Sequence, residues 1–393
     1  MENKKERNLK NVEEILSLAK LSPRELKPVF QALFFTDKNL HQHNYKLLQL
    51  DSQLLEEINV GSKLYFKGEK DDEVVICSDT KTFHVVEAET SNSLLLTHGA
   101  KFNKDIEDDV ESTVTDVTVA GIFYDYLETT LNKPHLKKID KLLENSIYKG
   151  PEYECDVDIN NLFTFEELCE KVQASIEEIK EALNSMTVVE INGKIRTLDL
   201  EYHFRVLTYM LKLIDENSWE LDEVDFQETL DSLQTLVPKE ILESLFEKYT
   251  EESKEIDGIP LYKYREDKVC TFFAQVLLHQ TGKFNLDEFL QAWKESVPEG
   301  LKPTEEMLYG IAIIDRKSVP NTIRAFEESS LPENINERFK ILFSAKEKWT
   351  VPEISPYIKR LTTEKLDVNA LLAKHARASK VDGIKYYSAK HGK

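Results

Sequence analysis

The sequence predicts an α+β protein in which a strand-rich N-terminal domain precedes a series of helical units that each end in a β-hairpin. In the first third of the chain, short β-branched and apolar runs follow one another closely, with turn residues between some of them. From Pro134 onward, apolar residues recur at helical spacing, and an aromatic residue stands just before an amphipathic helix four times. At about 100–200 residues per domain, the length of 393 residues predicts two to four domains.

The charge is distributed unevenly along the chain. The net charge is −21, which argues against a protein that binds phosphate over its whole surface. The segment from Lys340 to Lys393, however, contains twelve Lys or Arg residues and only five Asp or Glu residues. We therefore expect an acidic body and a basic C-terminal domain.

We assign residues 1–125 to the strand-rich domain, which begins with a short amphipathic helix at Val12–Lys20. So many short strands in one segment are typical of a small barrel or sandwich. The predicted strands are Tyr45–Asp51, Ser62–Gly68, Glu73–Asp79, Thr82–Glu89, Ser93–His98 and Ser112–Tyr124.

Two of these strands are apolar on both alternating faces. A strand that is buried on both sides needs covering material, and this domain has little helix to supply it. Either partner chains complete the sheet or the barrel is self-contained, and the pattern leaves both explanations open. On the first explanation, the partner-binding residues are Val74, Val75, Ile76, Leu94, Leu95 and Leu96.

A repeat follows in the remaining two thirds of the chain. Its aromatic markers Phe163, Trp219, Phe284 and Trp349 are 56, 65 and 65 residues apart, which is the size of a small helix-turn-helix domain. This spacing predicts four units, of which the second is the least regular. Their residues are 126–198, 199–265, 266–328 and 329–393.

The first unit indicates the architecture most clearly. Its first helix is predicted at Pro134–Ile147, and Thr164 and Ser175 each precede a Glu by three residues, as in a capping box. Two β-branched runs then surround Asn192-Gly193, which favours a hairpin with a type I′ turn. Helix, strand, helix, helix and hairpin is the order of a winged helix.

The last unit gives the same interpretation. Helices are predicted at Asn336–Trp349, Val351–Leu361 and Leu366–Lys380, and a hairpin at Val381–Lys390 turns at Asp382-Gly383. The third helix occupies the position of a recognition helix, the element that enters the DNA groove in helix-turn-helix proteins.

Only this last unit has a basic third helix, so we predict protein contacts for the three acidic units and DNA contacts for the last one. A basic helix face is usually just solvated surface, but its place on the recognition element favours DNA. In the predicted helix, Lys374, Arg377 and Lys380 recur every third residue beside His375, and Lys385 and Lys390 extend the positive surface onto the hairpin.

Motifs for catalysis, metal and cofactor binding are missing from the sequence. The cysteines Cys77, Cys155, Cys169 and Cys270 form no CxxC pair, so we expect no zinc site and no disulfide framework. No Walker A loop exists, and the first residues lead into no apolar signal segment. No apolar run reaches the roughly 18 residues needed to span a membrane. We therefore expect an intracellular non-enzyme without cofactors or metals.

Short sequence segments spread along the whole chain resemble those of the sister chromatid cohesion protein family called DCC. They are GEKDDEVVICSDTKTF, TSNSLLL, KFNLDEFLQAWKESVPEGL, GIAIIDRKS, ERFKILFSAKEKWTVPEISPYI and DGIKYYS, in the family's order.

The resemblance implies a nuclear subunit of an alternative replication factor C clamp loader. In that family, the N-terminal domain forms an interlocked β-barrel module with the large subunit of the loader and a small cohesion partner. The winged helices bind single- and double-stranded DNA and help the module dock on the catalytic part of DNA polymerase epsilon. The complex, with the remaining replication factor C subunits, loads or unloads the sliding clamp PCNA and supports DNA replication and cohesion through the cell cycle, while other subunits hydrolyse ATP.

Two points stay open at the level of sequence. The family is described with three winged helices, whereas the repeat predicts four, and the irregular second unit is the first suspect. The alternative function is a transcription factor made of tandem winged helices. Acidic helices in three of four units argue against it, because a series of DNA readers should be basic throughout.

Overall fold

The computed structural model describes residues 8–22, 30–35, 45–70, 72–102, 114–134, 136–256, 258–363 and 366–390. The chain divides into two compact units. The first contains residues 1–140 and 166–185, and the second contains residues 141–165 and 186–393. Both units combine helices with small sheets, which confirms the predicted α+β class.

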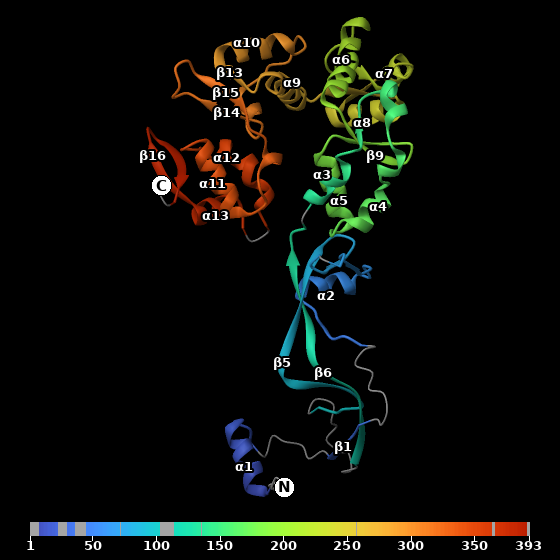
Figure 1. Ribbon diagram of the computed structural model, residues 1–393, viewed down its shortest axis with the longest axis vertical. Coiled ribbons are helices and arrows are strands. Elements are labelled where there is room, and N and C mark those ends of the chain that lie inside the picture. Colours follow the sequence, from blue (N-terminus) through green and yellow to red (C-terminus); the bar gives the residue numbers. More distant parts are fainter. Residues whose placement is uncertain are drawn as a thin grey trace. The chain divides into compact units, whose positions relative to one another are not determined.

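The first unit is built on one mixed sheet in the strand order β1-β6-β5-β4-β3, with β2 also paired to β6. Its two long strands, β5 and β6, lie side by side in Figure 1. The strands β1 and β2 run parallel to β6, whereas the other neighbours are antiparallel. Among the described strands, β1 and β3 are open edges, so the chain by itself forms no closed barrel there. The strands are β1 (Phe30–Phe35), β2 (Leu48–Gln49), β3 (Tyr65–Lys67), β4 (Val75–Cys77), β5 (Thr82–His98) and β6 (Val114–Asn132).

The strands β5 and β6 form a ribbon that is longer than predicted. The two strands expected at Thr82–Glu89 and Ser93–His98 are one strand, which continues through a register shift between Glu89 and Leu94. The partner strand β6 runs past residue 125, where we expected the domain to end, as far as Asn132. Backbone pairing to a long neighbour therefore continues through polar residues that look like a turn in the sequence.

Helix α2 (Ser52–Asn59), which the sequence analysis did not predict, covers part of this sheet. The side chain of Asp51 accepts a hydrogen bond from the backbone N–H of Leu54 at 2.7 Å and so caps the helix. Leu54 packs with Ile76 and Phe83 in the core of the first unit. The other helices of this part of the chain are α1 (Leu9–Leu18), α3 (Lys137–Leu143), α4 (Phe165–Lys171) and α5 (Ile176–Ser185).

In the second unit, a short strand or bridge precedes a helix and pairs with the second strand of the hairpin that follows. The pairs are β7 with β9, β10 with β12, β13 with β15, and the bridge between Trp349 and Tyr387. This pairing thus recurs four times among the described residues. The strands are β7 (Ile147–Tyr148), β8 (Val188–Ile191), β9 (Lys194–Leu198), β10 (Val224–Asp225), β11 (Thr250–Ile256), β12 (Ile259–Tyr264), β13 (Lys283–Asn285), β14 (Ala312–Asp315) and β15 (Thr322–Ala325).

The helices between these strands bury a large shared core, in which Trp293 donates its indole N–H to the carbonyl of Cys270 at 2.8 Å. In the third repeat, a single 3-10 turn at Glu305–Leu308 stands where the third helix before the hairpin was expected. The α-helices of this region are α6 (Leu200–Glu216), α7 (Phe226–Leu233), α8 (Lys239–Tyr249), α9 (Glu266–Thr281) and α10 (Leu286–Ser296). The remaining 3-10 turns are Pro151–Asp156, Ile159–Asn161, Glu328–Ser330 and Lys359–Leu361.

The last repeat is built around a second core, which surrounds Trp349, Tyr357 and Leu342 and also includes Ile313 of β14. Its hairpin turns at Asp382 and Gly383, as predicted, and their φ angles of 50° and 83° are those of a type I′ turn. The elements are α11 (Ile335–Ala345), α12 (Val351–Ile358), α13 (Val368–His375), β16 (Ala376–Val381) and β17 (Ile384–Ala389).

The predicted third helix of this repeat, Leu366–Lys380, is wrong beyond His375. The chain leaves the helix there and enters β16, which pairs with β17 over six residue pairs. The strand gains these backbone hydrogen bonds and buries Ala376 beside Tyr387 in the core. Such tertiary contacts outweigh the local helix propensity of residues such as Ala378.

Candidate assembly surface and nucleic-acid interface

The β5–β6 ribbon exposes apolar side chains on both of its faces. Leu94, Leu95 and Leu96 are consecutive in β5, so their side chains alternate between the faces, and they are 41%, 42% and 37% exposed. Large apolar side chains elsewhere in the ribbon and in β1 are also exposed: Leu33, Phe34, Phe35, Val86, Val114, Tyr124 and Leu131. An apolar surface of this kind is typical of a protein–protein interface.

The other predicted partner strand lies differently. Val75 and Ile76 are buried within the chain's own core, and only Val74 of that trio is exposed. The expectation that Val75 and Ile76 face a partner is corrected accordingly. Leu54 of helix α2, a helix that the sequence pattern did not reveal, packs against Ile76.

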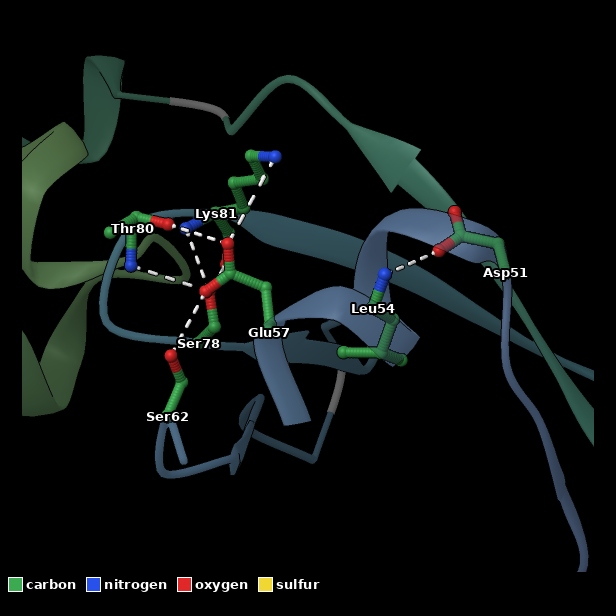
Figure 2. A network of polar contacts seen from close by, with 7 residues as sticks. All are labelled: Asp51, Leu54, Glu57, Ser62, Ser78, Thr80 and Lys81. Carbon is green, nitrogen blue, oxygen red and sulfur yellow. Dashed lines mark hydrogen bonds and ion pairs between the residues drawn. The ribbon is translucent and has the colours of Figure 1, made fainter. Parts of the chain in front are cut away.

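A polar network fixes the turn that leads into β5 (Figure 2). Glu57 of α2 accepts hydrogen bonds from the hydroxyl groups of Ser62 at 3.2 Å and Thr80 at 3.0 Å, and it lies 3.9 Å from the ammonium group of Lys81. Burial alone would raise the pKa of Glu57, but these partners and the hydroxyl of Ser78 hold it below the ordinary value. The ionised carboxylate thus ties α2 to the turn between β4 and β5.

The first residue after this turn reaches helix α5. The hydroxyl of Thr82 donates to the carboxylate of Glu178 at 2.6 Å and accepts the backbone N–H of Ser175 at 2.9 Å. Ser175 and Glu178 also form the predicted capping box, in which each side chain accepts the backbone N–H of the other residue. The N-terminal end of α5 is therefore occupied by the chain's own strand.

Lys67 contacts the segment that joins α4 to α5. Its ammonium group donates to the carbonyl oxygens of Cys169 and Ala174, both at 2.7 Å, where α4 ends. A cation at this position satisfies carbonyls that have no partner within the helix and opposes the negative end of the helix dipole. The helices α4 and α5 are consequently docked on the N-terminal sheet, and this agrees with their place in the first compact unit.

At the C-terminus, the structure separates the predicted DNA-binding residues into two groups. Lys374 and His375 end helix α13, whereas Arg377 and Lys380 are in β16. Because side chains alternate along a strand, Arg377 and Lys380 lie on opposite faces of the hairpin. Residues opposite each other share a face, so Arg377 lies with Ser388 and Lys380 with Lys385. The single basic helix face that the sequence predicted is therefore wrong.

Three of the basic residues gather where α13 ends. Lys390 donates from its ammonium group to the carbonyl of Lys374 at 2.9 Å. Burial lowers the pKa of His375, and the positive charges of Lys374 and Lys390 lower it further. Lys340 of α11, which the sequence did not single out, lines one groove together with Lys374, His375 and Lys390. The position of Lys340 in an amphipathic helix gave no sign that its side chain would lie near the end of α13, which comes much later in the sequence.

A buried arginine supports α11. Arg338 is 1% exposed and donates to the carbonyls of Pro332 at 2.6 Å, Tyr357 at 2.8 Å and Leu331 at 3.2 Å, and it pairs with the carboxylate of Glu328. A guanidinium group with so many fixed partners holds the helix firmly against the 3-10 turn before it. The basic surface therefore rests on rigid elements.

Neither metal ligands nor membrane spans are found in the described ranges. No group of three or more His, Cys, Asp or Glu side chains there could hold a metal ion. The helices described in the structure include none that is both long and apolar enough to cross a bilayer. Cys77, Cys155, Cys169 and Cys270 are free thiols.

Comparison with known proteins places the chain in a family. A family model described as "Sister chromatid cohesion protein Dcc1" matches residues 45–358. A relative named "Sister chromatid cohesion protein DCC1" in Danio rerio is 38% identical over 98% of this chain and 98% of its own length. Relatives of the same name in Homo sapiens and Saccharomyces cerevisiae are 34% and 23% identical, over 96% and 86% of this chain and 97% and 94% of their own lengths. With a family match over most of its length and relatives above 30% identity along nearly all of it, the chain belongs to the sister chromatid cohesion protein Dcc1 family.

Proposed function

We propose that this chain is a non-catalytic adaptor subunit of an alternative replication factor C clamp loader, which acts in the nucleus during DNA replication and sister chromatid cohesion. Membership of the Dcc1 family supports the role in cohesion. The two candidate surfaces support an adaptor, because one is apolar and suits protein partners while the other is basic and suits DNA.

The exposed ribbon is the observation that carries the proposal. Its partners are the large subunit of the loader and a small cohesion partner, whose strands complete an interlocked barrel with β5 and β6. Leu94, Leu95 and Leu96 are the contact residues, because all three are exposed although they alternate between faces. The open edges β1 and β3 offer unpaired backbone groups for further strands.

The four repeats are proposed to be winged helices, with the hairpins β8–β9, β11–β12, β14–β15 and β16–β17 as their wings. The same strand pairing in each repeat supports a count of four rather than three. The third repeat is the most divergent, because a 3-10 turn replaces its third helix.

The last repeat is proposed to bind single- and double-stranded DNA through the basic residues that gather where α13 ends, together with Lys340 of α11. Long-range attraction between lysine or arginine and phosphate needs no base-specific contact, so this binding is expected to be independent of sequence. The acidic first repeat is proposed to contact the catalytic part of DNA polymerase epsilon, and PCNA is reached only indirectly through the remaining replication factor C subunits.

Co-purification tests the assembly. The full-length chain is coexpressed with the large subunit and the small cohesion partner, and a variant carrying Leu94→Lys and Leu96→Lys is compared with the wild type. We expect the wild type to recover both partners and the variant to lose them. Leu236→Lys changes an exposed leucine of the second unit and serves as the control. Recovery of neither partner by the wild type, together with binding to one discrete DNA sequence, would support a transcription factor instead.

A further inference from the structure

A groove of about 1120 Å³ lies in the last repeat between helix α11, the end of α13 and the end of β17. It does not coincide with the basic helix face that the sequence predicted. It is lined by Asn336, Phe339, Lys340, Phe343, Ser344, Glu347, Lys374, His375, Ser388, Ala389 and Lys390.

Three aromatic rings follow one another along the lining of this groove. The ring centroids of Phe343 and Phe339 are 5.9 Å apart, and those of Phe339 and His375 are 5.3 Å apart with the planes inclined by only 15°. Phe339 is buried, whereas Phe343 and His375 are partly exposed. The Nε2 atom of His375 is buried and has no hydrogen-bond partner among the described residues. The groove thus offers ring surface at both ends of the row.

The charge around the rings is positive. Lys340, Lys374 and Lys390 all line the groove, and each is exposed. Among the described lining residues, Glu347 is the acidic one, and its carboxylate is already paired with Lys317 at 2.7 Å. The groove therefore attracts an anion along its length rather than at one point.

We propose that this groove is a track for single-stranded DNA, in which the lysines contact phosphates and unpaired bases lie against Phe343 and His375. The inference rests on the proposed DNA-binding function of the last repeat and gives it a location. Aromatic side chains beside a basic groove are the usual means of binding a single strand without sequence preference. A duplex keeps its base faces stacked inside, so it cannot use the rings.

The hairpin separates this track from the other basic residues. Lys380 and Lys385 share the face of the hairpin opposite to that of Ser388, which lines the groove. The pair thus provides a matched control, because reversing both charges changes the net charge as much as reversing Lys340 and Lys390 does.

A binding titration tests the proposal. The full-length chain is titrated against a fluorescein-labelled oligothymidylate and an unrelated duplex at a series of salt concentrations. We expect Lys340→Glu with Lys390→Glu to weaken single-strand binding. Because two phosphate contacts are lost, the slope of log K against log salt concentration should decrease in magnitude by about 1.4. Phe343→Leu should weaken single-strand binding about fivefold with an unchanged salt slope, because stacking is lost and charge is kept. The melting temperature of each variant shows whether it is folded.

The control decides between the track and general attraction. Lys380→Glu with Lys385→Glu should change single-strand affinity by less than about twofold. If both pairs weaken single-strand binding equally, or if the Lys340 and Lys390 variant and Phe343→Leu leave it unchanged, the track is wrong. In either case duplex binding by the wild type leaves the proposed DNA-binding function standing, whereas a wild type that binds neither DNA refutes both.

Discussion

At the scale of single residues, buried cations carry much of the local order. Arg196 of β9 is 2% exposed and donates from Nε to the carbonyl of Ser146 at 2.8 Å. Its two terminal nitrogens donate to the carboxylate of Glu154 at 2.7 and 2.8 Å. The sequence alone gave no reason to expect this arginine inside, because its role depends on a partner more than forty residues away along the chain.

Replacement of Arg196 by methionine should therefore destabilise the protein. The change keeps an unbranched apolar side chain but leaves the carboxylate of Glu154 and the carbonyl of Ser146 without their donor, which typically costs about 3–5 kcal/mol. Denaturant unfolding measures the loss. Arg205→Met is the control, since Arg205 pairs with Glu152 at the surface and such pairs contribute less than about 1 kcal/mol. Equal effects of the two substitutions would contradict this account.

We expect the free energy of unfolding to depend on pH because of His203. It is buried, with its ring stacked on Phe272 at 4.0 Å, and burial lowers its pKa to about 3, with a further contribution from the charge of Lys248. The folded protein therefore binds no proton there at pH 5, whereas the unfolded chain, with an ordinary pKa of about 6.5, does.

Stability from this site is present above about pH 6.5 and is lost as the pH falls towards 3, by up to about 1.4 kcal/mol per pH unit. His203→Phe keeps the stacked ring and removes the titration. Unfolding free energies of the wild type and the variant between pH 4 and 7 give the comparison. We expect a shallower slope for the variant, and identical slopes would show that His203 does not titrate as stated.

At the scale of elements, local signals located the turns and caps well. The Asn192-Gly193 and Asp382-Gly383 turns and the Ser175 capping box all lie where the sequence predicts them, because each depends on a few neighbouring residues. The switch from helix to strand after His375 depends on Tyr387 and Trp349, which are remote from it in sequence. The recurrence of Lys374, Arg377 and Lys380 at every third residue suggested one helix face and could not reveal that switch.

The lysine that caps α4 is expected to hold the α4–α5 pair on the sheet. Lys67→Met removes the donor from the carbonyls of Cys169 and Ala174, and hydrogen bonds from a charged group contribute about 1.5–3 kcal/mol each. Amide hydrogen exchange in residues 166–185 should become faster. The control is Lys63→Met, which changes an exposed lysine near by. Unchanged exchange in this segment would show that Lys67 does not hold the helices.

Helix α5 is also the element expected to contact the polymerase. Deleting the whole first repeat would remove helices on which the N-terminal sheet rests, so substitutions on the exposed side of α5 are cleaner. Glu177→Lys with Glu181→Lys should weaken binding to the catalytic part of DNA polymerase epsilon and should not weaken binding to DNA, because both carboxylates are exposed. Pull-down and anisotropy measure the two affinities. Loss of DNA affinity with polymerase binding intact would reverse the assignment.

At the scale of the whole molecule, the proposed function assigns the exposed ribbon to protein partners and the basic surface of the last repeat to DNA. The sequence predicted a need for partners from strands that are apolar on both faces. Leu94, Leu95 and Leu96 are exposed although they alternate between the faces, which is consistent with that prediction. The prediction failed for Val75 and Ile76, which are buried within the chain. Leu54 of helix α2 packs against Ile76, and the short sequence of α2 carries too weak a pattern to be recognised.

The central claim is that the β5–β6 ribbon and the basic surface of the last repeat act separately. Hydrogen exchange of the full-length chain tests this claim most directly. Adding the two barrel partners should protect residues 82–98 and 114–132, because their strands cover the ribbon, and should leave residues 336–345 and 374–390 unchanged. Adding single-stranded DNA should protect the latter segments and not the ribbon. Protection of the ribbon by DNA, or partner-induced protection confined to the last repeat, would contradict the account.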